Sequence, residues 1–207
     1  MASHTYITRL LRAGVRLIEY LIRKSLHVYE FTDEPDCILR IQLTPAPRSV
    51  HEGGVAVSKG DTVLVIHAWN ERMPKLPKEG PTLEWGIRLR RLAVHSFEAV
   101  ANELQKGGKY SQVRAIYGES TLFSFSDHTG GLRMIQHMGF TILPYRGSTG
   151  KFGEFWANLF SWWLLWAFND VSLQSRDFWR QERTEIWFMA EDFIERYGGK
   201  AEIRGSK

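Results

Sequence analysis

The sequence predicts an α/β (α+β) protein with a mixed, mostly parallel central sheet and helices on both faces. The segment TVLVIHA (62–68) is an almost unbroken apolar run, which is typical of an interior strand covered on both sides. Strand-like and helix-like segments then alternate over residues 62–144, and parallel strands require such helical crossovers. With 207 residues, 43% of them hydrophobic, the chain can form one core. We therefore expect a single domain over 1–207.

The first predicted elements are a helix and two strands. An amphipathic helix is expected over 5–26, because leucine and isoleucine recur at three- and four-residue spacing while the arginines fall largely elsewhere. CILRIQL (37–43) alternates as a half-buried strand does. The strand 62–68 follows a Lys-Gly-Asp turn, and prolines make the next loop rigid. Thr82 is then placed to cap a helix that runs to about Gln105.

The remaining elements complete the order α, β, β, α, β, α, β, α, α. VRAIY (113–117) and FTILP (140–144) predict strands, with a short helix, GLRMIQHM, between them. Two further helices are expected at about 152–169 and 174–197, ended by Gly198-Gly199. The core thus spans about 26–145, and an extra N-terminal helix and a Trp-rich C-terminal helical subdomain (about 152–198) flank it.

Composition narrows the classes of function. The single cysteine, Cys37, excludes an internal disulfide and a cysteine zinc site, and we expect it to be buried. The histidines lie in no metal-binding frame, so no metal site is predicted. Basic and acidic residues are interleaved at a net charge of +4, which does not favour nucleic acid. The first residues lack a secretory signal, so we expect a cytoplasmic location.

The best candidate site follows the strand 62–68. His67, Asn70 and Glu71 lie at its carboxyl end, where ligands of open α/β sheets tend to bind. A histidine and a carboxylate there can serve as base and orienter, and Asn70 can bind a carbonyl or hydroxyl group. Alternatively, Asn70 and Glu71 cap the turn and His67 is a buried polar group with a satisfied hydrogen bond.

An aromatic segment, FWANLFSWWLLWAF (155–168), leaves three interpretations open. Its 14 residues are too few for a helix to span a bilayer. The segment can be a helix buried against the sheet, a homodimer interface or a membrane-surface contact, where tryptophan is favoured. The basic N-terminal helix, with arginine on one face and leucine or isoleucine on the other, suits an anionic membrane surface.

The chain resembles the YkoP-like family of uncharacterised bacterial proteins over residues 26 to about 190. The likeness lies in YEFTDEPDCILRI, GDTVLVIHAWNERMP, GPTLEWGIRLRRL and WANLFSWWLLWAFND, in that order. It implies a bacterial origin and a link to cell-envelope polysaccharide metabolism, because related domains accompany polysaccharide deacetylases. It supplies no catalytic residues. We therefore expect a binding or accessory module, with peripheral attachment to the inner face of the membrane as an option.

The stretch 37–144 is also similar in order to the core of GCN5-related N-acetyltransferases. MIQHMGFTI resembles the late helix and Gly-Phe strand of that family. This likeness implies an acetyltransferase-like core and, as the alternative function, an acyl-CoA-dependent N-acyltransferase. His67 or Glu71 would be its base, Asn70 would orient substrate, and Gly80 and Thr82 at the helix start would bind the cofactor phosphate. LPKEGPTLEWG departs from the family loop, because Pro81 removes an N–H donor.

Overall fold

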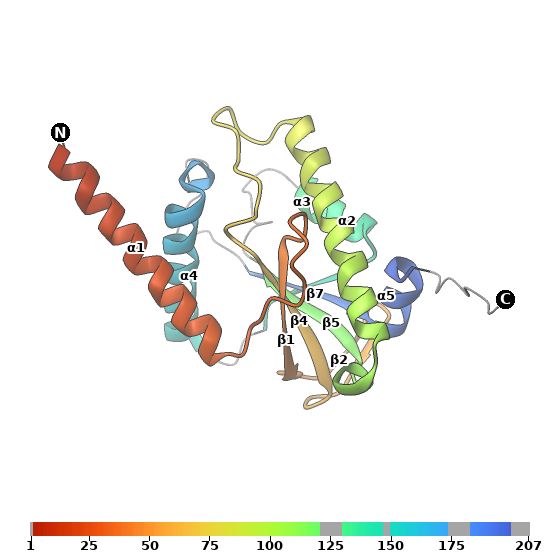
Figure 1. Ribbon diagram of the computed structural model, residues 1–207. Coiled ribbons are helices and arrows are strands. Elements are labelled where there is room, and N and C mark those ends of the chain that lie inside the picture. The colour runs from red at the N-terminus through yellow and green to blue at the C-terminus, as the bar shows by residue number, and fades with distance from the viewer. Residues whose placement is uncertain (1, 121–129, 147–149, 174–182, 200–207) are drawn as a thin grey trace.

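A five-stranded sheet lies between two helical layers in the computed structural model, which describes residues 2–120, 130–146, 150–173 and 183–199 (Figure 1). The strand order is β1-β4-β5-β7-β6. The strands are β1 (Leu39–Pro45), β4 (Thr62–Ala68), β5 (Ala115–Ser120), β6 (Thr141–Pro144) and β7 (Thr184–Met189). A hairpin of β2 (Val50–Glu52) and β3 (Val55–Val57) forms a second small sheet. The predicted α/β (α+β) class is confirmed, and β4 is an interior strand as expected.

The prediction of a mostly parallel sheet is wrong. Only β4 and β5 pair in parallel, whereas β1–β4, β5–β7 and β6–β7 are antiparallel. The strands β4, β5 and β6 do run in one direction, as helical crossovers require. However, β7 lies between β5 and β6 and runs the opposite way, so it converts one expected parallel contact into two antiparallel ones.

The helix expected over 174–197 is also corrected. Residues 184–189 form β7, and only α5 (Ala190–Tyr197) at its end is helical, while residues 174–182 lie outside the described residues. TEIWFM alternates between the two faces of the sheet, with β-branched and aromatic side chains that suit a strand. Its pairing with two neighbouring strands therefore outweighs the helical periodicity of its surroundings.

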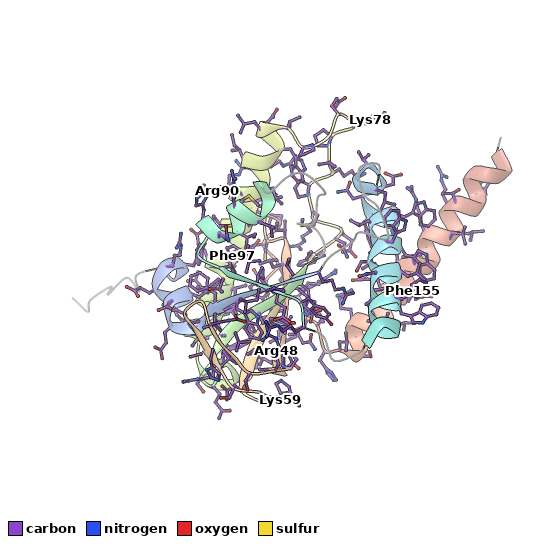
Figure 2. The ribbon with its side chains drawn as sticks, turned by 180° about the vertical axis from the view of Figure 1, so that it is seen from behind. Arg48, Lys59, Lys78, Arg90, Phe97 and Phe155 are labelled. Carbon is purple, nitrogen blue, oxygen red and sulfur yellow. The ribbon has the colours of Figure 1, made fainter. Side chains whose placement is uncertain are left out.

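One face of the sheet carries the main apolar core. Helices α2 (Leu83–Gln105), α3 (Gly130–His137) and α5 cover this face. Phe97 of α2, labelled in Figure 2, packs against Phe140 and Phe193, with ring centroids 5.2 and 5.8 Å away. A 3-10 turn at Gly108–Tyr110 then leads into β5. The alternate side chains of β1, β4, β5 and β7, among them Ile41, Leu64 and Ile116, complete the core.

The other face of the sheet is divided between two coverings. The β2–β3 hairpin packs valines against one half, where Val63, Ala115 and Trp187 are fully buried. Helices α1 (Ala2–Ser25) and α4 (Gly150–Phe168), followed by a 3-10 turn at Asp170–Leu173, lie side by side beyond the other half (Figure 1). This second half presents polar side chains to the two helices, and the candidate site lies there.

Candidate functional site

A cavity of about 550 Å³ separates the polar half of the sheet from α1 and α4. This volume is typical of small-molecule sites. The sheet contributes Arg40, Gln42, His67, Tyr117 and Glu119, because residues two apart on a strand share a face. The helical side contributes apolar side chains, namely Ile22 of α1, Leu26 just after α1, and Phe160, Leu164 and Leu165 of α4, together with the charged Glu19 and Arg23 of α1.

His67 lies near the end of β4 and faces this cavity. Its Nε2 atom is 2.9 Å from Oε1 of Gln42 on the neighbouring strand. Burial, and secondarily the positive charge of Arg40, lowers the pKa of His67 from 6.5 to about 4. The imidazole is therefore neutral at pH 7, and its two nitrogens offer one donor and one acceptor.

The structure brings Asn70 to the same cavity and directs Glu71 elsewhere. Asn70 lines the cavity together with His67. Within the described part of the chain, no hydrogen bond engages the Asn70 side chain, so its amide can contact a ligand. Glu71 is not among the described lining residues, and its Oε2 lies 3.2 Å from Nη2 of Arg40. This ion pair makes Glu71 a partner of Arg40, and whether Glu71 acts as a base stays a prediction.

Arg40 is the residue at this site that sequence reasoning missed. Its side chain is only 2% exposed, stacks over Trp69 at 4.7 Å, and contacts Glu19 of α1, Glu30 and Glu71 at 3.1 to 3.3 Å. A single guanidinium thus joins α1, the following loop and the β4–α2 loop to β1. The sequence does indicate a polar strand face that contains Arg40, because the polar residues Arg40, Gln42 and Thr44 alternate with apolar ones and so share one face of β1.

A second polar group lines the cavity from β5. The Tyr117 hydroxyl donates to Oε1 of Glu119 at 2.5 Å, and Nη1 of Arg183 is 3.6 Å from Oε2 of Glu119. Nε of Arg183 donates to Oδ1 of Asn158 on α4 at 3.2 Å. Burial and the Glu119 carboxylate raise the pKa of Tyr117, so the phenol stays protonated at neutral pH.

Gly80 and Thr82 are not among the described residues that line the cavity. Gly80 adopts φ +94° in the turn before α2, and Thr82 is the N-cap, whose Oγ1 accepts from N of Trp85 at 3.2 Å. The predicted cap is therefore present. The role of these two residues in binding a cofactor stays a prediction.

The described residues offer no group of three or more His, Cys, Asp or Glu side chains able to hold a metal ion. Cys37 is fully buried, as expected, with Sγ 3.6 Å from O of Leu39. Of the helices that the structure describes, none is long and apolar enough to cross a membrane.

Comparisons with known proteins identify a family. No curated protein matches the chain, and no solved structure matches it. The family model of the YkoP domain matches residues 8–197, which include α4, most of α1 and all five strands of the main sheet. The chain therefore belongs to the YkoP domain family.

Proposed function

We propose that this protein is a binding module that lies on an anionic membrane surface through α1 and α4. The observation that carries the proposal is the orientation of α1, whose apolar face is turned away from the rest of the protein. Leu10, Leu17 and Leu21 are 73%, 58% and 56% exposed. A contiguous apolar helix face of this size on a protein surface marks an interaction site.

The polar edge of α1 supports the same orientation because it is the edge that faces the protein. Arg12 pairs with Asp170 at 2.6 Å and lies over the Trp166 ring of α4. Glu19 is buried against Arg40, and Nη1 of Arg23 is 3.1 Å from Oε1 of Glu30. These contacts fix the rotation of α1 about its axis, and the leucine face is left without intramolecular cover.

The neighbouring helix adds aromatic side chains to the proposed contact. Phe155, Trp156 and Trp163 are among the exposed large apolar residues, and Figure 2 shows Phe155 on the side of α4 away from the sheet. Tryptophan is favoured at the boundary between lipid and water. Exposed Arg9 and Lys24 on α1 provide positive charge for anionic headgroups.

The setting of the module is part of the same proposal. It comprises a cytoplasmic location, attachment to the inner face of the membrane and a role in cell-envelope polysaccharide metabolism, the last of which is what the resemblance to the YkoP-like family implies. A second copy of the chain is the competing occupant of the α1 face.

Vesicle co-sedimentation tests the proposal. The wild-type chain is expected to bind anionic vesicles at low salt and to bind less as salt rises. Replacing Leu10 and Leu17 by Gln should weaken binding about 100-fold, because each inserted leucine contributes about 1.5 kcal/mol or more. Leu83→Gln on α2, where Leu83 is 83% exposed, is the matched control and should bind as wild type.

Two results would overturn the membrane proposal. One is an absence of vesicle binding at low salt. The other is a dimer, detected by light scattering, that the double leucine variant dissociates while vesicle binding is unchanged, because the apolar face would then be covered by a second copy.

The acyl-CoA-dependent N-acyltransferase is retained as a second candidate because of one observation. The parallel β4–β5 pair is joined by α2, and His67 and Asn70 lie at the end of β4 beside a cavity. This candidate predicts that millimolar CoA raises the melting temperature, since a ligand bound only by the folded state stabilises it. An unchanged melting temperature would count against it.

A further inference from the structure

We propose that the cavity between the sheet and the α1–α4 layer binds an amphiphile with an uncharged, hydroxylated head and one acyl chain. The head would contact the sheet and the chain would lie against the two helices. This inference rests on the proposed function, because the bilayer under α1 and α4 is the source of such a ligand.

The cavity has two chemically different walls. Ile22 of α1, Leu26 just after it, and Phe160, Leu164 and Leu165 of α4 form the apolar part of the helical wall, which can cover an acyl chain. Glu19 and Arg23 of α1 also line this wall, and they are paired with each other and with Arg40 and Glu30. The opposite wall is the polar half of the sheet, with Gln42, Thr44 and His67 on adjacent strands and Asn70 after β4. A ligand that contacts both walls must itself be polar at one end and apolar at the other.

The charged groups around the cavity are already paired with one another. Arg40 is surrounded by Glu19, Glu30 and Glu71, and Arg23 pairs with Glu19 and Glu30. On the opposite side Arg183 pairs with Glu119. Three guanidinium groups thus face four carboxylates, so among the described lining residues no cation is left to bind a phosphate or a carboxylate.

The polar groups that remain for a ligand are uncharged. Nε2 of the neutral His67 ring is hydrogen-bonded to Gln42. The Nε2 amide group of Gln42 and the Thr44 hydroxyl are further uncharged groups on this wall. The Asn70 amide can both donate and accept hydrogen bonds. Hydroxyl groups also donate and accept, and they need no counter-charge. The charge balance of the cavity therefore selects an uncharged, hydroxylated head over an anionic one.

The proximity of the cavity to the proposed bilayer contact supports a lipid source. The helices that supply the apolar wall are those whose outer faces carry Leu10, Leu17 and Trp163. One layer of helices thus separates the cavity from the membrane, and an acyl chain could pass from one to the other beside α1 or α4.

Calorimetric titration without vesicles tests this inference. The probes are monododecanoylglycerol and dodecanoate, which share the same chain length but differ in head charge, each below its aggregation concentration. The wild-type chain should bind monododecanoylglycerol at least about tenfold more tightly than dodecanoate. This comparison needs no variant, so it stands even if a substitution prevents folding.

Variants locate the probe in the cavity. Asn70→Leu removes the available amide and should weaken monododecanoylglycerol binding about tenfold. Leu83→Gln should leave it unchanged. The Leu10→Gln/Leu17→Gln variant should also bind the soluble probe as wild type, although it loses vesicle binding, because its substitutions lie on the outer face of α1.

Three outcomes would overturn the inference. Equal affinity for the two probes would show that the head charge is not selected. Unchanged binding by Asn70→Leu would place the head elsewhere. Loss of the soluble probe by the Leu10→Gln/Leu17→Gln variant would place the chain on the outer face. Failure of vesicle binding with intact, head-selective binding would instead remove only the membrane proposal.

Discussion

Replacing Arg40 by leucine should destabilise the fold far more than replacing an exposed arginine. Arg40 is 2% exposed and is the common partner of Glu19, Glu30 and Glu71. Glu30 and Glu71 can regain water, because each is about half exposed. Glu19 cannot, since it is buried between α1 and the sheet. Removing one partner of a buried ion pair costs about 3–5 kcal/mol, and we expect Arg40→Leu to fall in that range.

The cost of Arg40→Leu should also depend on pH. Burial raises the pKa of Glu19 above its ordinary value of 4.5 even in the presence of Arg40. An acid whose folded pKa is raised stabilises the fold below its unfolded pKa and loses that contribution as pH rises through the folded pKa. Without Arg40 the pKa of Glu19 rises further. The deficit should therefore be smaller at pH 5 than at pH 7.5.

Urea unfolding at these two pH values measures the effect. The free energy of unfolding is compared among the wild type, Arg40→Leu, Arg40→Leu/Glu19→Leu and the control Arg88→Leu, whose arginine is exposed on α2. The double variant should recover on the order of 2 kcal/mol, because no uncompensated carboxylate stays buried. A loss below about 1 kcal/mol, the upper end of what a surface ion pair contributes, that does not change with pH would refute the buried ion cluster.

Two further predictions concern His67 and Gly139. The pKa of His67 is lowered to about 4, so the stability that its neutral form contributes is present above pH 6.5 and is lost as pH falls toward 4. Relative to His67→Gln, the free energy of unfolding of the wild type should fall by about 3 kcal/mol over this interval, and parallel pH profiles of the two proteins in urea unfolding would contradict this. Gly139→Ala should cost more than about 2 kcal/mol, because φ is +96° and a Cβ would lie 2.8 Å from the Phe188 ring. In the control Gly54→Ala, φ is +85° but a Cβ would meet no atom, so this variant should lose only the stability that the unfavourable backbone conformation costs. Equal melting temperatures for the two variants would refute the clash at Gly139.

The sequence predicts best the elements whose local pattern agrees with their environment. The strand 62–68 and the helix that begins after Thr82 are found where expected, because an unbroken apolar run and a capped amphipathic stripe leave few alternatives. The strand β7 was missed, because its six residues follow a segment without Gly or Pro that continues a helical periodicity. Its identity depends on β5 and β6, whose paired residues lie 40 or more positions earlier in the chain.

The candidate site shows the same limit. His67 and Asn70, which were singled out from the end of an interior strand, lie beside a cavity, and their role there stays a prediction. Arg40 escaped prediction because its importance comes from register: in the antiparallel pair β1–β4, Arg40 lies directly opposite His67. This pairing places a positive charge beside the imidazole and contributes to its low pKa. A strand pattern read by itself contains no information about which residue lies across from it.

The rotation of α1 is the reverse of the one that its apolar stripe alone would favour. Amphipathic helices of globular proteins normally bury their apolar stripe, and each leucine that leaves water contributes about 1.5–3 kcal/mol. The exposed pair Arg12–Asp170 contributes at most about 1 kcal/mol. The buried Arg40 cluster holds the polar edge inward and leaves at least three leucines in water. Under the proposed function, a bilayer would cover these leucines along the outer face of α1 and would offset the cost of leaving them in water.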